Sequence, residues 1–371
     1  MGYVPVKGGT NAIEASIERL KYERLKSEEI IEIKTIMATM GSLVDQVMSE
    51  SSLYSPELAA LAIKQAEGSM EEAVFLMRAH RSTLPRQYYS ETAEAESMLV
   101  ERRISASFKD IPGGQLLGAT YDYTHRLLDF ELSEENPQKN RQWLTEYKKQ
   151  LAAVEAGDAV VYFPKVVDYL REEGLFEEYA ANDSEPDDVT KKSLGFPASR
   201  SARLQVLTRG QTGAVTSLGY ASLRGYGQVH PTVGEVRVGK IPVYVEHPNE
   251  AEQETDDQFY IGEIRITEVE SFVPVTVKNS NNEDELEFEI GYGVCYGQNE
   301  TKAIAMSILD QCLEHPNNSF PTHDEEFVLL HIDSVESTGF ISHLKLPHYV
   351  TFQSKLDSIR QIRKEVQPIE S

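Results

Sequence analysis

The hydrophobic pattern changes its period along the chain, and this change constrains the fold more than any other feature of the sequence. Over the first hundred residues apolar side chains recur every three or four positions, as in Ser27–Ser49, which is typical of amphipathic helices. Beyond about residue 210 apolar and charged residues alternate, as in Ile261–Val269, which is typical of half-buried strands. We therefore expect an α+β fold, with a helical N-terminal region followed by a C-terminal region of mainly antiparallel sheet.

Start and stop signals locate several elements. Ser55-Pro56 predicts a helix start, and Ser69 with Glu72 forms a capping box for a second helix that ends at Leu84-Pro85. The expected apolar face of this second helix is Ala73, Phe75, Leu76 and Ala79. Three domains are expected: a helical domain over 1–100, a Gly- and aromatic-rich region over 101–205 that holds an acidic insert at 131–185 with a helix at 140–155, and an α+β domain over 206–371.

The C-terminal pattern predicts further elements. The alternation over 235–245 surrounds Gly239-Lys240 and predicts a hairpin, and 281–287 is expected to be an acidic loop. A strand over 288–296 is expected to be broken by Gly291 and Gly293. The remaining assignments are a helix over 300–314 capped by Asn299, an undecided stretch over 326–346, and an amphipathic helix over 350–366.

Composition excludes several classes of protein. The chain has 371 residues, with 36 Lys and Arg against 60 Asp and Glu, which gives a formal charge of −24. This balance argues against a nucleic acid or an anionic membrane as partner, because both need a basic face. The two cysteines, Cys295 and Cys312, are too few for a disulfide framework or an iron–sulfur cluster. No apolar run approaches the roughly 18 residues of a membrane span. We expect a soluble cytoplasmic protein.

The densest run of chemically useful residues is KDIPGGQLLGATYDYTHR, at 109–126. Gly113 and Gly114 allow the backbone to approach a ligand closely or to take a positive φ. No G-K-[ST] follows the glycines, so the run is not a Walker A loop. A structured loop with solvated charges is the alternative. The run's other functional groups are Lys109 and Arg126 for phosphate contacts, and Asp110, Asp122 and His125 for acid–base chemistry.

Arginines gather in two later stretches, SRSAR at 199–203 and LRGYGQVHP at 223–231. Arg200, Arg203 and Arg224 carry planar guanidinium groups that suit bidentate contacts with phosphate. An acidic protein that binds a polyphosphate must concentrate its few cations locally. Surface ion pairs in a chain with surplus acid are the alternative.

Two histidines, His343 and His348, flank the run LKLP. Because Pro347 favours extended geometry for the residue before it, the two imidazoles do not share a regular helical face, but a turn can direct both at one ion. Two ligands do not complete a zinc site, so a third must come from another residue or another chain. Two unrelated histidines are the alternative. The acidic cluster at 323–326 suits either Mg²⁺ or a solvated helix start.

Seven runs together resemble the PhnI family, whose members are subunits of the carbon–phosphorus lyase core complex of bacterial phosphonate metabolism. They are YVPVKGG (3–9), ELAALAIKQA (57–66), ERRISASFKDIPGGQLLGATYDYTHRLLDF (101–130), SRSARLQ (199–205), RGYGQVHP (224–231), DEEFVLLH (324–331) and GFISHLKLPHYV (339–350). The insert at 131–185 and the stretch 247–287 match poorly, so nothing is carried over there.

The resemblance implies a part in replacing adenine of MgATP by a phosphonate at the ribose C1′ carbon, which gives ribose 1-methylphosphonate 5-triphosphate from methylphosphonate. It implies that this subunit is a purine nucleosidase that assembles with the G, H and J subunits and the ATPase-like L subunit, with J breaking the carbon–phosphorus bond. It also implies zinc at the interface with J, bound by His343 and His348. A structural subunit that is catalytic only within the complex, and an unrelated nucleotide-binding protein, are the alternatives.

Cleavage of an N-glycosidic bond builds positive charge on the ribose and negative charge on the leaving adenine. The site therefore needs a carboxylate near C1′ and an acid near the purine. The expected assignments are Asp110 or Asp122 at the ribose, His125 or His230 at the leaving base, and Arg200, Arg203, Arg224 and Lys109 around the triphosphate, with Gly113 and Gly114 in the loop beside it.

Overall fold

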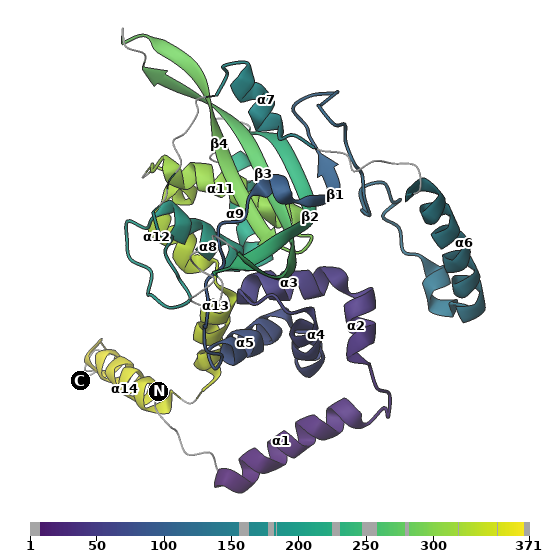
Figure 1. The fold of residues 1–371 in the computed structure, drawn as a ribbon. Coiled ribbons are helices and arrows are strands. Elements are labelled where there is room, and N and C mark those ends of the chain that lie inside the picture. Colours follow the sequence, from purple (N-terminus) through teal and green to yellow (C-terminus); the bar gives the residue numbers. More distant parts are fainter. Residues whose placement is uncertain are drawn as a thin grey trace. The chain divides into compact units, whose positions relative to one another are not determined.

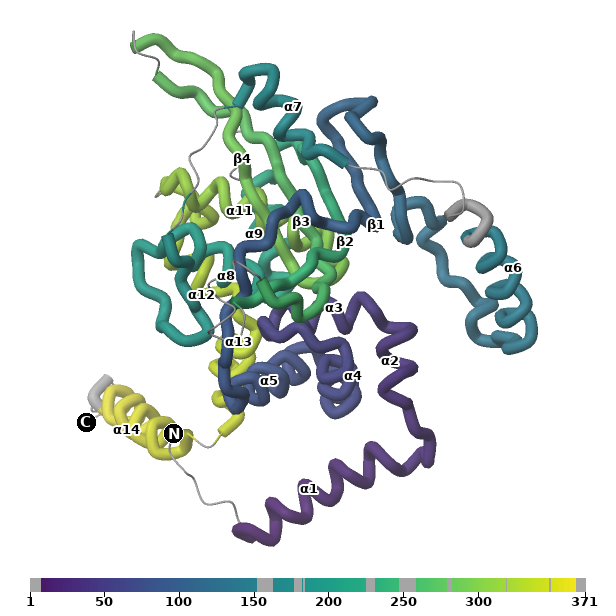
Figure 2. Tube along the Cα trace, in the orientation of Figure 1, coloured from purple at the N-terminus to yellow at the C-terminus, as the bar shows by residue number. Residues whose placement is uncertain are grey.

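The computed structural model describes residues 8–155, 163–176, 182, 184–224, 231–246, 258–278, 282–317, 319–346 and 348–366 (Figures 1 and 2). The chain divides into two compact units. The first runs from the N-terminal helices to Thr83 and takes in the chain from Leu330 onward, and the second spans Leu84–Leu329. The domain boundaries expected near residues 100 and 205 stay a prediction. None of the described helices is both long and apolar enough to cross a membrane.

The first unit is helical. In chain order its helices are α1 (Gly9–Leu25), α2 (Ile33–Thr39), α3 (Gly41–Ser51), α4 (Pro56–Gln65), α5 (Met70–Arg81), α13 (Ser334–Ser342) and α14 (Tyr349–Val366). Helices α3, α4 and α5 pack against one another, and α13 packs against α5. Both predicted caps are confirmed, because the Ser55 hydroxyl accepts from the Leu58 amide and the Ser69 hydroxyl from the Glu72 amide, each at 3.4 Å. Such caps contribute about 1 kcal/mol each.

The second unit is built on one sheet. Its described strands are β1 (Leu99–Ile104), β2 (Thr232–Val245), β3 (Phe259–Lys278) and β4 (Asp284–Tyr296), in the order β1-β2-β3-β4, and every pair is antiparallel. The helices are α6 (Pro137–Glu155), α7 (Val166–Glu172), α8 (Arg200–Arg209), α9 (Thr212–Arg224), α11 (Glu300–Glu314) and α12 (Glu325–His331), whose last two residues lie in the first unit. The predicted α+β class is confirmed.

The two faces of the sheet carry different layers. Helix α11 packs on β3 and β4, and α9 and α8 pack on α11 (Figure 1). On the other face, α7 contributes Val166, Val167 and Leu170 to an apolar cluster that contains Phe272 of β3. Since neighbouring residues of a strand point to opposite faces, each strand supplies side chains to both layers.

Glycines of the sheet allow close packing. A Cβ at Gly291 or Gly293 would lie 2.0 Å from the carbonyl oxygen of Ser307 or Ala303 in α11. A Cβ at Gly239 would lie 2.4 Å from the carbonyl oxygen of Leu99 in β1. These glycines are therefore places where a helix or a neighbouring strand crosses the backbone of the sheet.

The structure differs from several predicted elements, and the close packing at the glycines explains the first two differences. Residues 235–245 form part of one continuous strand and no hairpin, and β4 runs through its glycines unbroken from Asp284, inside the expected acidic loop. Residues 212–224 are a helix, although strands were expected from about 210. The buried face of α5 is Ala73, Val74 and Met77, while Phe75 is exposed. The undecided stretch over 326–346 is helical, and Asn299 precedes α11 without a side-chain cap.

Candidate functional site

The loop after β1 contains the densest predicted site residues and folds around a buried arginine, Arg103. The Arg103 guanidinium donates to the carbonyl oxygens of Pro112 at 2.6 Å, Gly114 at 3.0 Å and Pro164 at 2.6 Å, and it pairs with Glu235 of β2. The chain turns back along β1 here, because the Arg103 amide donates to the Leu116 carbonyl and the Leu116 amide donates to the Arg103 carbonyl (Figure 2). Gly113 and Gly114 have φ of 80° and 77°, so their conformation directs carbonyls at an internal cation. Their phosphate role stays a prediction.

The neighbouring arginine, Arg102, holds the next part of the same loop from the opposite face of β1. Its guanidinium donates to the Leu117 carbonyl and, at 2.5 Å, to Oδ2 of Asp122, and its Nε lies 2.9 Å from Oε1 of Glu300. The Gln298 side-chain amide adds a 3.1 Å bond to the Ala119 carbonyl. Asp122 thus stands at a fixed place, with 52% of its side chain open to solvent.

The remaining predicted residues of the loop are exposed to solvent: Lys109, Asp110, His125 and Arg126. Arg126 Nη2 lies 3.9 Å from Oδ1 of Asp122, so these two predicted groups are neighbours. The apolar residues that follow are also exposed, including Leu127 and Leu128 at 83% and Phe130 at 79%. The described residues therefore form an open surface at the predicted carboxylates.

A buried network of charges, which the sequence did not predict, covers the α7 face of the sheet. Lys165 Nζ lies 3.2 Å from Oε1 of Glu268 and 2.8 Å from Oε1 of Glu270. Arg237 also pairs with Glu268, whose Oε1 accepts from the Tyr292 hydroxyl at 2.9 Å. Buried charges of this kind persist only when they are paired. Charged residues that alternate with apolar ones look like a solvent face in sequence, which is why the network was missed.

The network shifts the pKa values of its members in opposite directions. Burial alone would raise the pKa of Glu268, but the charges of Arg237 and Lys165 outweigh it and hold that pKa below the ordinary 4.5. Burial raises the pKa of Glu270 above 4.5, and the nearby Lys165 offsets this only in part. Burial and the two glutamates also raise the pKa of the Tyr292 hydroxyl well above its ordinary value.

The predicted arginine clamp lies at the other edge of the sheet. Arg200 makes two bonds to the buried carboxylate of Asp310, at 3.2 and 2.6 Å, and donates to the Ile290 carbonyl of β4 at 3.3 Å. Arg203 pairs with Glu314 and donates to the Ala198 carbonyl at 3.2 Å.

The structure therefore brings Arg200 and Arg203 together on α8, beside β4, whereas Asp122 is held on β1, the strand at the opposite edge. Arg224 is exposed at the end of α9, and His230 lies outside the described residues. Their phosphate and acid roles stay predictions.

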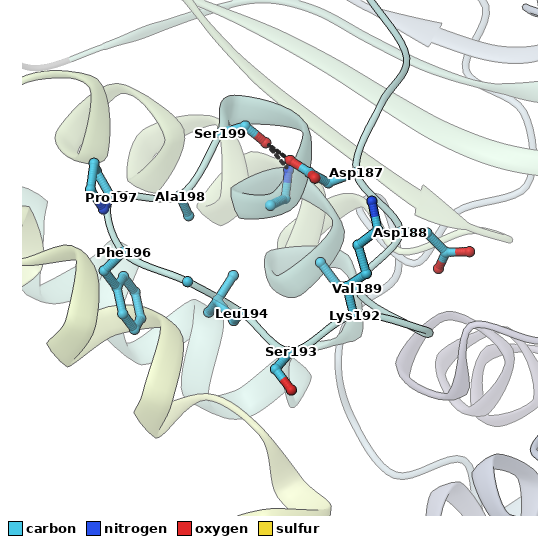
Figure 3. Close-up of a pocket in the computed structure, with 12 residues that line it drawn as sticks. Asp187, Asp188, Val189, Lys192, Ser193, Leu194, Phe196, Pro197, Ala198 and Ser199 are labelled. Atoms are coloured by element: carbon cyan, nitrogen blue, oxygen red, sulfur yellow. Dashed lines mark hydrogen bonds between the residues drawn. The ribbon is translucent and has the colours of Figure 1, made fainter.

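A pocket of about 310 Å³ lies beside the start of α8 (Figure 3). Residues 187–199 form most of its wall, and Ala202 completes it. Ser199 caps α8 by accepting from the Ala202 amide at 3.2 Å, and its hydroxyl donates to Asp187. The sequence shows no motif over residues 187–198, so the pocket was not predicted.

The two predicted metal ligands are neighbours in the first unit. The ring centroids of His343 and His348 are 5.4 Å apart; His343 is half-buried and His348 is exposed. The Nδ1 atom of His343 contacts the Phe340 carbonyl, and Nδ1 of His348 lies 2.6 Å from the Leu346 carbonyl. In metal-binding histidines the ring nitrogen that does not bind the ion commonly donates a hydrogen bond to a carbonyl. With Nδ1 on a carbonyl, Nε2 is left for the ion. The pair therefore fits a metal.

A complete ligand set is not formed by the part of the chain that the structure describes, since no three His, Cys, Asp or Glu residues gather there. The acidic cluster at 323–326 serves the fold instead. Asp324 accepts from the Phe327 amide at 2.9 Å, and the Glu325 carboxylate accepts from the Ala198 amide at 3.1 Å. The helix-start interpretation of that cluster therefore agrees with the structure.

Comparison with known proteins gives matches over nearly the whole chain. The family model described as bacterial phosphonate metabolism protein (PhnI) matches residues 2–366. A putative C-P lyase subunit protein, HtxH, of Stutzerimonas stutzeri is 43% identical, over 97% of this chain and 95% of its own. The alpha-D-ribose 1-methylphosphonate 5-triphosphate synthase subunits PhnI of Rhizobium meliloti (strain 1021) and Escherichia coli (strain K12) are 42% and 40% identical, each over 98% of this chain and over 95% and 99% of their own. With a family model and relatives that all span nearly its full length, this chain belongs to the PhnI family.

Proposed function

We propose that this chain is a subunit of a complex that makes ribose 1-methylphosphonate 5-triphosphate, and that it releases adenine from MgATP in that reaction. One observation supports the proposal above others: two relatives that are 40–42% identical over 98% of the chain are named as subunits of the enzyme that makes this product. The other proposed partners are the G, H and J subunits, the ATPase-like L subunit, and an alkylphosphonate as second substrate.

The proposed mechanism uses the loop after β1. Asp122, or Asp110, stabilises the positive charge that develops on the ribose as the glycosidic bond breaks, and His125 or His230 protonates or hydrogen-bonds the leaving adenine. Arg200 and Arg203 lie beside β4, at the opposite edge of the sheet from Asp122. We therefore propose that Lys109 and Arg126, which are close in sequence to the carboxylates, bind the triphosphate, and that this remote binding energy lowers the barrier at C1′.

The histidine pair is the proposed zinc site of the complex. His343 and His348 would supply two imidazole ligands, a donor type that suits zinc, and a partner chain would supply the rest. When bound, zinc supplies a Lewis acid for phosphate or phosphonate oxygens. This role agrees with the exposure of His348 and the partial exposure of His343, which leave the pair accessible to a second chain.

A second candidate is a scaffold subunit that becomes catalytic only with its partners. The exposure of Asp122 and of the apolar Leu127, Leu128 and Phe130 favours it, since a glycosidic site works best when water is excluded. In this version another subunit covers the loop and completes the site.

Adenine release separates the two candidates. The purified chain is incubated with MgATP, with and without methylphosphonate, and adenine is followed by chromatography. Release by the chain alone supports the nucleosidase, whereas release only after the other subunits are added supports the scaffold. The variants Asp110→Asn and Asp122→Asn locate the chemistry, and Asp168→Asn is the matched control because Asp168 also pairs with an arginine, at 3.0 Å. Parent rates for both of the first two variants would contradict the assignment.

A further inference from the structure

We infer that Arg102 is a positioning residue that fixes the side chain of Asp122, the carboxylate proposed to face the ribose. The inference rests on the proposed function and adds to it the residue that sets the geometry of the site. Three separate features of β1 and its loop support it: a bulge in the strand, a glycine that crosses the strand, and the set of groups that the Arg102 guanidinium binds.

The bulge lies directly before Arg102. The register of β1 on β2 shifts between Val100, opposite Gly239, and Arg102, opposite Val238, so Glu101 is an extra residue. Bulges redirect side chains and often occur beside functional sites. Here Arg102 is directed at Glu300, the first residue of α11, while the following residue, Arg103, enters the network on the other face.

The glycine is Gly118, where the loop passes over this bulge. Its φ is 59°, and a Cβ there would lie 2.7 Å from the Glu101 carbonyl oxygen and 3.0 Å from the Arg102 Cβ. Only a residue without a side chain allows this approach. The close crossing brings the Leu117 carbonyl onto the Arg102 guanidinium, five residues before the Asp122 carboxylate that binds the same group.

The guanidinium itself is held independently of Asp122. Arg102 is 4% exposed, and both the Leu117 carbonyl and the Glu300 carboxylate contact it. Asp122 therefore binds a group that is already fixed, although its own side chain is 52% exposed and would otherwise sample several rotamers. Its backbone is fixed as well, since its amide donates to the Thr120 hydroxyl at 3.1 Å and the Thr124 amide donates to the Tyr121 carbonyl at 3.0 Å.

This arrangement leaves one edge of the carboxylate on Arg102 and the other toward solvent. A lysine at this position would keep the charge but not the planar fork that reaches Leu117, Asp122 and Glu300 at once. A positive charge alone is therefore insufficient to hold the Asp122 carboxylate in place. The conservative variant Arg102→Lys keeps the charge and tests whether the position of that carboxylate matters.

The experiment compares Arg102→Lys, Asp122→Asn and the double variant, in the full chain or in the reconstituted complex if only that is active. We expect Arg102→Lys to lower kcat for adenine release about 10- to 100-fold, as loss of an orienting partner does elsewhere, with KM for MgATP within about twofold. The double variant should be no slower than Asp122→Asn, because Arg102 acts through Asp122. Amide hydrogen exchange over 118–124 should become faster in Arg102→Lys.

The control is Arg171→Lys, which alters another arginine–aspartate pair of the same unit, Arg171 with Asp168 at 3.0 Å. An unchanged kcat in Arg102→Lys, or a fall that adds to that of Asp122→Asn, overturns the inference. If Arg102→Lys does not fold, Gly118→Ala takes its place, since it displaces the Leu117 carbonyl and predicts the same non-additivity. If the parent protein releases no adenine in any assembly, the proposed function fails, and unchanged exchange over 118–124 then overturns the positioning role separately.

Discussion

The loop after β1 and the histidine segment after α13 carry two of the most distinctive runs of this sequence, but they are built in opposite ways. The loop depends on Arg103 and Glu235, which are 0% and 2% exposed, and its carbonyls face inward. Of the histidines, His348 is exposed and His343 half-buried, and their carbonyl contacts are local to residues 340–348. In one region distinctive residues neutralise buried charge, and in the other they present ligands outward. A distinctive motif therefore does not by itself indicate a surface site.

The largest expected effect on stability is in the loop after β1, at the buried Arg103. Arg103→Met leaves Glu235 without its cation and removes the donors of three carbonyls, so we expect a loss of about 3–5 kcal/mol in the free energy of unfolding. Urea unfolding followed by circular dichroism measures it. The double variant Arg103→Met with Glu235→Leu should recover part of the loss, and a double variant as unstable as the single one would show that the charge pair is not the cause.

The next effect tests the glycines on which α11 packs. Gly293→Ala places a Cβ 2.0 Å from the Ala303 carbonyl oxygen, so β4 and α11 must separate, at a cost of about 1–3 kcal/mol. Gly339→Ala in α13 is the control, because no atom lies within 4 Å of the new Cβ, and it should stabilise by about 0.5–1 kcal/mol. Thermal unfolding of both variants measures the contrast. Equal shifts in the two variants would refute the packing role.

The pH dependence of the free energy of unfolding distinguishes two members of the buried network, Glu268 and Glu270. Because the pKa of Glu268 is lowered by folding, its contribution is present above pH 4.5 and is lost as the pH falls through the lowered pKa. Because the pKa of Glu270 is raised, its contribution is present below pH 4.5 and is lost as the pH rises through the raised pKa. Relative to the parent, Glu270→Gln should gain stability as the pH rises above 4.5.

The partner variant Glu268→Gln should show the opposite sign, losing stability relative to the parent as the pH rises toward 4.5. Chemical unfolding at a series of pH values, from about 3 to 7, measures both differences. If the stability difference from the parent changed with pH in the same direction in both variants, the pKa values of Glu268 and Glu270 would not be shifted in opposite directions.

The smallest effect on stability is expected at the histidines. His343→Ala and His348→Ala remove a half-buried and an exposed ring whose hydrogen bonds are local, so the free energy of unfolding should change by less than about 0.5 kcal/mol. Zinc that copurifies with the assembled complex should nevertheless fall in both variants, which elemental analysis measures. His80→Ala, another exposed histidine of the first unit, is the control. Retention of zinc in both His343→Ala and His348→Ala would remove the pair from the metal site.

The sequence predicted what local chemistry decides. The Ser55 and Ser69 caps and the helix over 140–155 depend on neighbours within a few residues, and each is confirmed. Gly239 was interpreted as a turn because a glycine in an alternating pattern usually marks one. Its actual role depends on β1, which lies more than a hundred residues earlier in the chain and is not visible in the local pattern.

The candidate site was predictable only in part, for the same reason. The residues of the run at 109–126 lie in one loop, as adjacency in sequence requires, but the buried Arg102 and Arg103 and the half-buried Glu300 come from a strand and a helix. Nothing in the alternation of β3 distinguishes the buried Glu268 from an exposed glutamate. Whether a side chain is buried and where it points depend on partners that are distant in sequence. Local sequence patterns therefore cannot predict either property.

The ion pair between Arg78 and Asp333, which joins α5 to α13, has a consequence for biosynthesis. Its two residues are 255 positions apart, at 2.5 Å in the folded chain. At about 5–20 residues per second of translation, α5 waits roughly 13–50 s for its partner to be made. The first helices to leave the ribosome therefore belong to the last unit to be completed. Throughout that interval the surface of α5 that α13 will cover is accessible to chaperones. A chain truncated before residue 333 lacks α13, so its N-terminal helices cannot complete their unit.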